Sequence, residues 1–388
     1  MNDVQLLFVV LAALYVWECA CWLRRGSVGF VTWWGRGWRA VYPGALAGNS
    51  NGGFILAAPL PPLGTVFIAN QLPLSLAPDG VLAFVATNVN PGWRPGQSDS
   101  FVRWENLSAV RVRGKKLLVN GELFCVAATS GFARYLKAEL LRLVKLTPAQ
   151  RETAIAAMRR GALEGQGIDS RLREYRARSS VVRCLVNGLF LYLVVIGPGL
   201  IWYFGFGLTG LGLLLGLLAL TITTATFFCR AHHALYPEAS DERFTHTLTI
   251  ALAPSSALRA HDALSRPLLE NFHPLAVAKQ LLPDKAFRPI ARRVLLDLRH
   301  PVRPLVPSEQ PGVVATEAYS RHVLLAAVEE FLRQHGIDPD ELGRAPAPAD
   351  DLCRSFCPRC DAQFTTPTGQ CADCGGLPVV ELRRSGGR

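Results

Sequence analysis

Charged residues are missing from one long stretch of the sequence. Residues Cys184–Cys229 contain no Asp, Glu, Lys or Arg. A helix needs ~20 apolar residues to cross the hydrocarbon core of a bilayer, and this stretch is about twice as long. It therefore predicts a membrane hairpin of two helices, Cys184–Phe204 and Leu208–Cys229, joined by a tight turn. Because the hairpin also lacks histidine, the sequence argues against an ion or proton pathway through it.

Several common catalytic motifs are missing as well. The sequence has no HExxH zinc-protease motif, no P-loop and no kinase motif set. A GxGxxG pattern occurs at residues 205–210, but it falls in the predicted membrane turn and lacks the preceding strand that a dinucleotide site needs. The motifs name no reaction, and this favours a protein that is not an enzyme.

Histidine is absent before residue 232, and all eight histidines fall within His232–His335. A metal or acid–base site needs several ionisable side chains to converge. The candidates for a catalytic site in this region are His261, Asp262, Glu270 and His273. The alternative interpretation is that these residues are helix caps and surface side chains of a helical domain.

Positive charge exceeds negative charge, with a formal net charge of +11 and a pI near 9.4. In a soluble protein this excess would point to nucleic acid. Here the basic residues gather beside the hairpin, as they do on the cytoplasmic flanks of membrane helices. Arg230 follows the hairpin directly, and five arginines precede it: Arg171, Arg173, Arg176, Arg178 and Arg183. Both ends of the hairpin are therefore expected in the cytoplasm.

A second apolar run, Val4–Leu23, contains Glu18 as its only charged residue. The run follows an acidic start rather than a basic one, and Arg24 and Arg25 come after it, so it does not have the layout of a signal peptide. We expect an uncleaved transmembrane helix with its N-terminus outside the cell. This orientation makes the protein a multi-pass protein of the cytoplasmic (inner) membrane, with its main domains and C-terminus in the cytosol.

The sequence between these membrane elements carries β signals. Residues Ala109–Arg113 alternate between apolar and basic, and Asn120-Gly121 is a strong hairpin-turn signal before a strand at Leu123–Ala127. A helix is expected at Phe132–Leu146. Meandering strands with one closing helix, centred on WENLSAVRVRGKKLLVNGELFCVAATSGFARYLKAEL, resemble a bacterial pleckstrin-homology-like domain over residues 74–146. The resemblance implies a module that binds lipid or a protein segment, or that serves as a scaffold.

The region after the hairpin reads as mainly helical. Phe244–Leu252 alternates between threonine and apolar residues and predicts a strand, with a short helix as the alternative. Helical patterns are expected at Pro148–Arg160 before the hairpin, and after it at Ser256–Glu270, Pro274–Leu282, Phe287–Leu298 and Thr316–His335.

The last part of the chain contains half of the ten cysteines. Cys357 and Cys360 form one CxxC pair, and Cys371 and Cys374 form another. Four thiolates at this spacing suit tetrahedral Zn²⁺, and the segment Phe356–Val380 resembles a zinc ribbon. The resemblance implies a closed, structural Zn²⁺ site, with a rubredoxin-like iron site or a redox pair as the alternative. Zinc ribbons bind nucleic acid, protein or nothing beyond their own chain, so the module names no partner.

A small-residue pair lies in the second helix of the predicted hairpin. Gly212 and Gly216 form a GxxxG pattern, which lets two helix backbones approach closely. The pair could pack against the other arm of the hairpin, against the first transmembrane helix, or against a second copy of the chain in a homo-oligomer.

The sequence thus predicts an α+β membrane protein with three transmembrane helices. The expected segments are transmembrane helix 1 (4–23), a β-rich membrane-proximal domain (24–146), a basic helical linker (147–183), the hairpin (184–229), a mainly helical cytosolic domain (230–344), an Ala/Pro linker (345–352) and the zinc ribbon with its tail (353–388). The two resemblances each cover one module, and no family is indicated for the whole chain.

Three functions are compatible with this organisation. The favoured one is a non-enzymatic scaffold or sensor on the lipid bilayer that presents cytosolic modules to an unidentified protein partner. The second is a membrane-associated enzyme that uses the candidate His, Asp and Glu residues of region 230–344. The third, a membrane-tethered nucleic-acid binder, is the weakest, because the ribbon has few aromatic side chains for base stacking.

Overall fold

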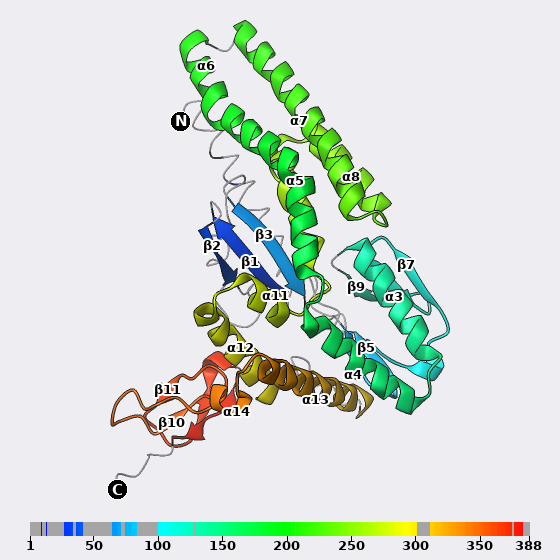
Figure 1. Ribbon diagram of the computed structural model, residues 1–388, viewed down its shortest axis with the longest axis vertical. Helices are drawn as coiled ribbons and strands as arrows, with labels where there is room; N and C mark the ends of the chain where they lie inside the picture. The colour runs from blue at the N-terminus through cyan, green and yellow to red at the C-terminus, as the bar shows by residue number, and fades with distance from the viewer. Residues whose placement is uncertain are drawn as a thin grey trace.

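The computed structural model describes residues 27–33, 36–41, 64–70, 74–83, 100–127, 129–205, 207–300, 311–374 and 376–382, together with Val9 and Ala13. Two long helices project from one end of the folded body, and the cysteine-rich module lies at the opposite end (Figure 1). Apart from Val9 and Ala13, the predicted transmembrane helix 4–23 lies outside the described residues.

An antiparallel sheet near the N-terminus has the strand order β2-β1-β3. Its strands are β1 (Ser27–Trp33), β2 (Arg36–Val41) and β3 (Gly64–Asn70). Phe30 and Phe67 face each other across β1 and β3, and both side chains are buried. The Ser265 hydroxyl donates a hydrogen bond to the Val66 carbonyl of β3 at 2.7 Å, which joins the sheet to the region after the hairpin.

One hydrophobic core joins residues that are far apart in the sequence. It takes buried side chains from this sheet, from the helices on both sides of the hairpin and from the long helix α13. The helices that follow the hairpin are α8 (Ser240–Leu252), α9 (Pro254–Leu258), α10 (Ala260–Ser265), η3 (Arg266–Leu269), α11 (Pro274–Leu281), α12 (Asp284–Arg299), α13 (Pro311–Gln334) and α14 (Pro339–Leu342). Along α12, Phe287, Ala291 and Leu295 recur every four residues and are fully buried, as expected for one apolar face of a helix.

Residues 74–127 contain two further three-stranded antiparallel sheets, β4-β5-β6 and β7-β8-β9. Their strands are β4 (Leu74–Leu76), β5 (Gly80–Ala83), β6 (Ser100–Arg103), β7 (Val110–Arg113), β8 (Lys116–Val119) and β9 (Glu122–Val126). The predicted turn at Asn120-Gly121 is confirmed, since it joins β8 to β9 with φ angles of 54° and 90°. The predicted helix that follows is α3 (Ser130–Val144), which packs on β7 and β8.

Helix α4 (Pro148–Glu164) ties these sheets to the rest of the body. It begins at a capping box between Thr147 and Gln150, and it extends one turn beyond the predicted helix. Arg159 is buried on α4 and donates hydrogen bonds to the Leu74 carbonyl at 3.2 Å and to the Ser320 hydroxyl at 2.9 Å. One guanidinium therefore bridges strand β4 and helix α13.

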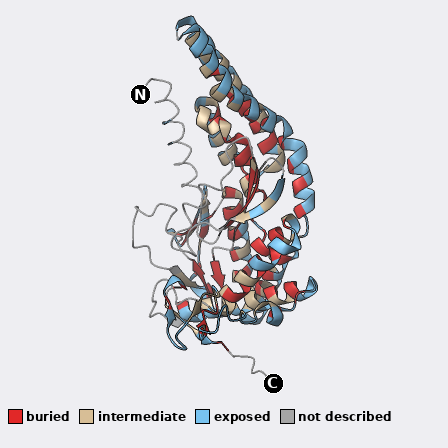
Figure 2. Cartoon of the chain, turned by 90° about the vertical axis from the view of Figure 1, so that its left-hand side faces the viewer, coloured by how far each residue is buried: buried red, intermediate tan, exposed pale blue. Residues whose placement is uncertain are grey.

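The projecting helices correspond to the predicted hairpin. The first is continuous from Ile168 to Phe204 and comprises α5 (Ile168–Leu191), a π-helical turn η2 (Tyr192–Ile196) and α6 (Gly197–Phe204); the second is α7 (Gly207–Leu235). Both are long and apolar enough to cross a membrane. Only 17% and 22% of their most apolar windows are buried, whereas a core helix of a soluble protein would be mostly covered. Figure 2 shows this part in pale blue and tan above a body with a red interior.

The π-helical turn lies next to a proline in the first helix of the hairpin. It ends directly before Gly197 and Pro198, and the proline cannot donate the backbone hydrogen bond of a regular helix. A π turn is one of the usual ways in which a helix absorbs such a defect.

The two glycines of the GxxxG pattern have different surroundings. The Tyr192 hydroxyl donates a hydrogen bond to the Leu213 carbonyl at 2.8 Å. A Cβ atom on Gly216 would overlap this hydroxyl, so Gly216 allows the two arms of the hairpin to approach each other. No described atom lies within 4 Å of a Cβ placed on Gly212.

Two of the predicted elements after the hairpin are wrong. The strand expected at Phe244–Leu252 is wrong and the alternative, a short helix, is confirmed: the segment belongs to helix α8, in which the Thr245 and Thr249 hydroxyls donate to carbonyls one turn earlier at 2.9 and 3.0 Å. The packing of α8 on α7 offsets the low helix propensity of threonine. The single helix expected at Ser256–Glu270 is divided into α9, α10 and η3.

The different surroundings of the two glycines lead to a test. We expect Gly216→Ala to lower the stability of the detergent-solubilised protein by about 1–3 kcal/mol, because the new methyl group overlaps the Tyr192 hydroxyl. Gly212→Ala is the matched control and should be neutral or slightly stabilising, since alanine favours the helix and meets no described neighbour. Thermal unfolding followed by circular dichroism measures both. Equal losses in the two variants, with loss of a cross-linked dimer, would assign the pair to a second copy instead.

Candidate metal centre

The C-terminal module is built from very short elements. Its strands are β10 (Ser355–Phe356), β11 (Gln363–Phe364), β12 (Gln370–Cys371), β13 (Leu377–Pro378) and β14 (Val380–Glu381), with a 3₁₀ turn η4 (Ala372–Cys374). The buried residues at its centre are cysteines, surrounded by partly buried Ala362, Phe364, Leu377 and Val379. An apolar centre of this size is too small to hold a fold, so a module of this kind needs a metal or cross-link.

Four cysteines converge at this centre. The Sγ atoms of Cys357, Cys360, Cys371 and Cys374 all lie within 4.8 Å of one another. The Cys360 and Cys371 sulfurs are 3.7 Å apart, close to the ~3.8 Å edge of a tetrahedron with Zn–S bonds of ~2.3 Å. Three of these cysteines are buried, and Cys360 is exposed. Within the described part of the chain, no other group of three or more His, Cys, Asp or Glu residues has this geometry.

Two tight turns bring the sulfurs together. In the first, the Cys357 amide donates to the Ala362 carbonyl at 2.8 Å, and the Asp361 amide donates to the Cys357 carbonyl at 3.0 Å. Asp361 has a φ of 60°, which glycine adopts freely and which aspartate and asparagine tolerate better than most residues. In the second, the Gly376 amide donates to the Cys371 carbonyl at 2.9 Å, with φ 83° at Gly376.

Packing the thiols together perturbs their ionisation in opposite directions. Burial raises the pKa of Cys360 to about 11, and burial together with the thiols of Cys360 and Cys357 raises the pKa of Cys374. Burial acts in the same direction on Cys357, but the backbone amides of Cys360 and Arg359 hydrogen-bond its sulfur and bring the net pKa below its ordinary value. Four thiolates this close need a cation to offset their charges, so the arrangement suits a metal that displaces the thiol protons.

Two ion pairs of opposite polarity attach the first turn to helix α12. Arg292 of the helix donates two hydrogen bonds to the Asp361 carboxylate at 2.9 and 2.7 Å. In the reverse sense, Arg359 of the turn donates to Asp297 of the helix. Asp361 therefore combines an uncommon backbone conformation beside the metal-binding sulfurs with the main ionic contact of the module.

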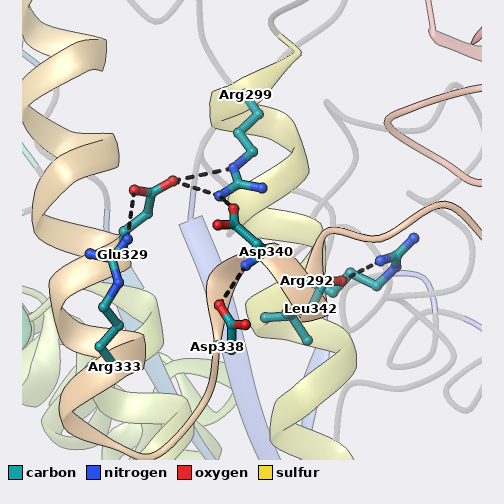
Figure 3. Close-up of polar contacts among 7 residues, drawn as sticks. All are labelled: Arg292, Arg299, Glu329, Arg333, Asp338, Asp340 and Leu342. Carbon is teal, nitrogen blue, oxygen red and sulfur yellow. Dashed lines mark hydrogen bonds and ion pairs between the residues drawn. The ribbon is translucent and has the colours of Figure 1, made fainter.

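The anchoring helix is itself held by a polar network (Figure 3). Arg292 also donates to the Leu342 carbonyl at the end of α14. Two residues after Asp297, Arg299 donates to Glu329 of α13 at 2.7 Å and to Asp340 of α14 at 2.8 Å. These contacts connect the cysteine-rich module through α12 to the main core, to which α12 contributes its apolar face.

The catalytic candidates lie in different contacts. A small pocket is lined by His261 and Asp262 together with Arg183 and Asn187. Glu270 and His273 do not line it. The Tyr175 hydroxyl is 2.7 Å from His261 Nε2, and Asp262 pairs with Arg259 at 3.1 Å with both side chains buried. The first contact joins α5 to α10, and the second is a local pair at the start of α10.

The remaining two candidates serve other elements. Glu270 accepts a hydrogen bond from the Thr129 hydroxyl, which caps α3, and His273 Nδ1 accepts one from the Leu275 amide at 3.2 Å and caps α11. Burial lowers the pKa of His261 to about 4 and that of His273 to about 3, so both imidazoles are neutral near pH 7. The contacts of the four residues are those that hold helices and loops together.

Sequence reasoning named the four sulfurs but missed the charged residues that anchor them. Asp361 and Arg359 lie within or beside the first CxxC pair, whereas Arg292 and Asp297 lie more than 60 positions earlier. No local pattern connects the two segments. The one available signal is an aspartate where a glycine or other small residue is expected after the second cysteine of a pair.

Replacing one sulfur ligand should remove the metal. We expect Cys374→Ser to reduce bound metal from about one equivalent per chain to near zero and to make the module sensitive to protease, because three thiolates hold the ion far less tightly. Cys353→Ser is the matched control, since this nearby thiol is outside the cluster and the variant should retain the metal. Plasma mass spectrometry of the purified chain measures metal content and identity. Retention of a full equivalent by Cys374→Ser would contradict the four-sulfur site.

The ion pair between α12 and the first turn can be tested by a double-mutant cycle. Arg292→Gln and Asp361→Asn should each destabilise the module, and the double variant should show a coupling energy of about 1 kcal/mol, because the pair is bidentate and half-buried. Asn tolerates the backbone conformation of Asp361, so the cycle isolates the charge. Exposed Asp373→Asn is the control and should combine additively with Arg292→Gln. Urea-induced metal release, followed with a chromogenic chelator, gives the free energy of unfolding of each variant. A coupling energy of zero would show that the ion pair does not stabilise the module.

Comparison with known proteins adds no information about this module. No family model, no curated protein and no solved structure matches the chain. The four close cysteines are compatible with a zinc ribbon and could hold a metal ion.

Proposed function

We propose that this protein is a non-enzymatic scaffold or sensor of the cytoplasmic membrane, anchored by the α5–α7 hairpin, with its folded modules and a structural Zn²⁺ site in the cytosol. The observation that carries this proposal is the change of environment along one continuous helix. Leu172, Tyr175 and Val182 of α5 are buried in the core, whereas Leu191 and Val195 further along are about half exposed. Exposed apolar side chains on a helix of this length suit lipid better than water.

The dimensions of the hairpin support a crossing. From Arg183 to Phe204 the helix rises by about 30 Å, which is the thickness of a bilayer's hydrocarbon core. Trp202, Tyr203 and Phe204 are 89%, 79% and 65% exposed at the tip, and aromatic side chains favour the membrane–water interface. At the other end, the arginines of α5 and Arg230 of α7 mark the cytoplasmic side.

The β sheets of residues 74–127 with their closing helix α3 support an interaction role. The module consists of two three-stranded antiparallel sheets followed by one helix, and Arg111, Arg113 and Lys116 are exposed on it. The module also contacts the helices beyond the hairpin. Glu242 of α8 accepts a hydrogen bond from the Ser130 amide at 2.6 Å and pairs with Lys115 at 3.7 Å. A ligand bound to this module would therefore act close to the membrane anchor.

The four-cysteine site supports a structural rather than a catalytic metal. A site with four sulfur ligands has no open position for a substrate, and Zn²⁺ is the common ion in such sites. The enzymatic alternative has less support, because only two of its four candidate residues line the pocket beside α5.

The first experiment is membrane fractionation of the full-length chain with a reporter after Arg388. We expect the protein to remain in the membrane pellet after alkaline carbonate and to be released only by detergent. A fluorescent-protein fusion should be bright and an alkaline phosphatase fusion inactive, as for a cytosolic C-terminus. Carbonate release, or an active phosphatase fusion, would overturn the anchor or its orientation respectively. Cross-linking in intact cells followed by mass spectrometry then seeks a stoichiometric protein partner, whose absence would contradict the scaffold role.

A further inference from the structure

Helix α8 carries an exposed apolar stripe that the folded body does not cover. Phe244, Leu248 and Leu252 recur every four residues and are 71%, 48% and 74% exposed. The opposite face, which includes buried Ile250, packs on α7. Between Arg243 and Arg259 the chain contains no Asp, Glu, Lys or Arg. An exposed apolar stripe of this kind would favour aggregation in water, so we expect it to be covered by something other than water.

Contacts between α7 and α8 fix the level of the stripe. The two helices run antiparallel: Arg243 Nη1 lies 2.9 Å from His233 Nδ1, and the rings of His246 and Phe228 have centroids 6.1 Å apart. Continuing this register places His246 near the level of Arg230 and Leu252 near the level of Thr224. The C-terminal half of α8 therefore lies beside the uncharged part of α7, where Leu218 and Ile222 are also about half exposed. By this register, Ile222 lies just beyond the level of Leu252, so the exposed apolar side chains of α8 and α7 follow one another along the helix pair.

Polar groups along this surface already have partners within the protein. On α8 the Thr245 and Thr249 hydroxyls donate to carbonyls of their own helix. On α7 the exposed Thr223 and Thr226 hydroxyls do the same, at 2.7 and 2.9 Å. Hydroxyl groups bonded in this way need no water and are tolerated in lipid.

Part of the turn after α8 is paired within the protein. The Ala253 amide donates to the Thr249 carbonyl at 2.9 Å, and the Ala253 carbonyl accepts from the Ala257 amide at 3.0 Å. The next residue, Pro254, has no amide proton to place. Helix α9 then packs against α5 and α7, and Leu258 reaches the pocket beside Arg183. At membrane depth, non-helical backbone is tolerated where it is buried in protein, and the packing of α9 on α5 and α7 meets this condition.

We propose that residues 247–258 form a re-entrant element that dips into the cytosolic leaflet beside α7 and returns to the surface at Arg259. Leu248 and Leu252 contact lipid acyl chains, and Phe244 lies at the headgroup level. At ~1.5 Å per residue, the two turns of α8 beyond His246 reach only ~10 Å into the leaflet, so the element does not cross the bilayer. This inference rests on the proposed membrane anchor and adds a further contact between the protein and the membrane.

The test measures depth at single positions of the full-length chain in phosphatidylethanolamine–phosphatidylglycerol liposomes. A ketone-bearing amino acid, p-acetylphenylalanine, replaces Leu248, Leu252, Leu214 or Glu238 in separate variants and is coupled to a nitroxide, which leaves the native cysteines intact. All four side chains are exposed, so the label requires no repacking. Power-saturation electron paramagnetic resonance compares collision with oxygen, which partitions into lipid, and with a water-soluble nickel chelate.

The four positions separate the inference from the anchor on which it rests. We expect a severalfold higher oxygen-to-nickel ratio at positions 248 and 252 than at 238, with the highest ratio at 214 in the middle of the hairpin. A ratio at 252 equal to that at 238, with 214 still in lipid, would overturn the re-entrant element and leave the anchor standing. Nickel access at 214 as high as at 238 would overturn both.

Discussion

The continuity of helix α5 is the constraint on which the arrangement of the molecule depends. Its first half is part of the main hydrophobic core, and its second half carries the exposed apolar surface of the hairpin. No loop separates the two halves, because the helix extends without interruption to Phe204 apart from its π-helical turn. Bending the hairpin against the body would therefore require breaking helical hydrogen bonds or removing Tyr175 and Val182 from the core. In the proposed role as a membrane anchor, this helix would fix the direction of the body relative to the membrane.

The cysteine-rich module lies at the other end of the same chain of contacts. Helix α12 inserts its apolar face into the core and directs charged side chains toward the module and toward α13 and α14. The module is small, but its position is set by paired charges and not only by its short linker. The four-cysteine module and the two projecting helices are thus held in one body, at its two ends (Figure 1).

Patterns of neighbouring residues predict turns and helix starts well. They do not predict contacts between residues that are far apart in the sequence. The hairpin turn at Asn120-Gly121 and the capped helix after Thr147 depend on neighbouring residues, and both are present. The alternation in Phe244–Leu252 suggested a strand because it was judged without α7, whose packing favours a helix. The four sulfurs were predictable from spacing, whereas the pairing of Arg292 with Asp361 and of Ser265 with Val66 depends on residues brought together only by the fold.

The position of the first sheet has a consequence for biosynthesis. Strands β1 and β3 bury Phe30 and Phe67 in a core that also needs α10, α11 and α13, which lie beyond the hairpin in the chain. At translation rates of about 5–20 residues per second, these strands wait on the order of tens of seconds before the last of their partners leaves the ribosome. During this interval the hairpin has already emerged, so under the proposed membrane anchoring its delivery to the bilayer would precede completion of the core. The earliest strands are still uncovered at this stage, which is therefore the stage at which chaperones have most access to the nascent chain.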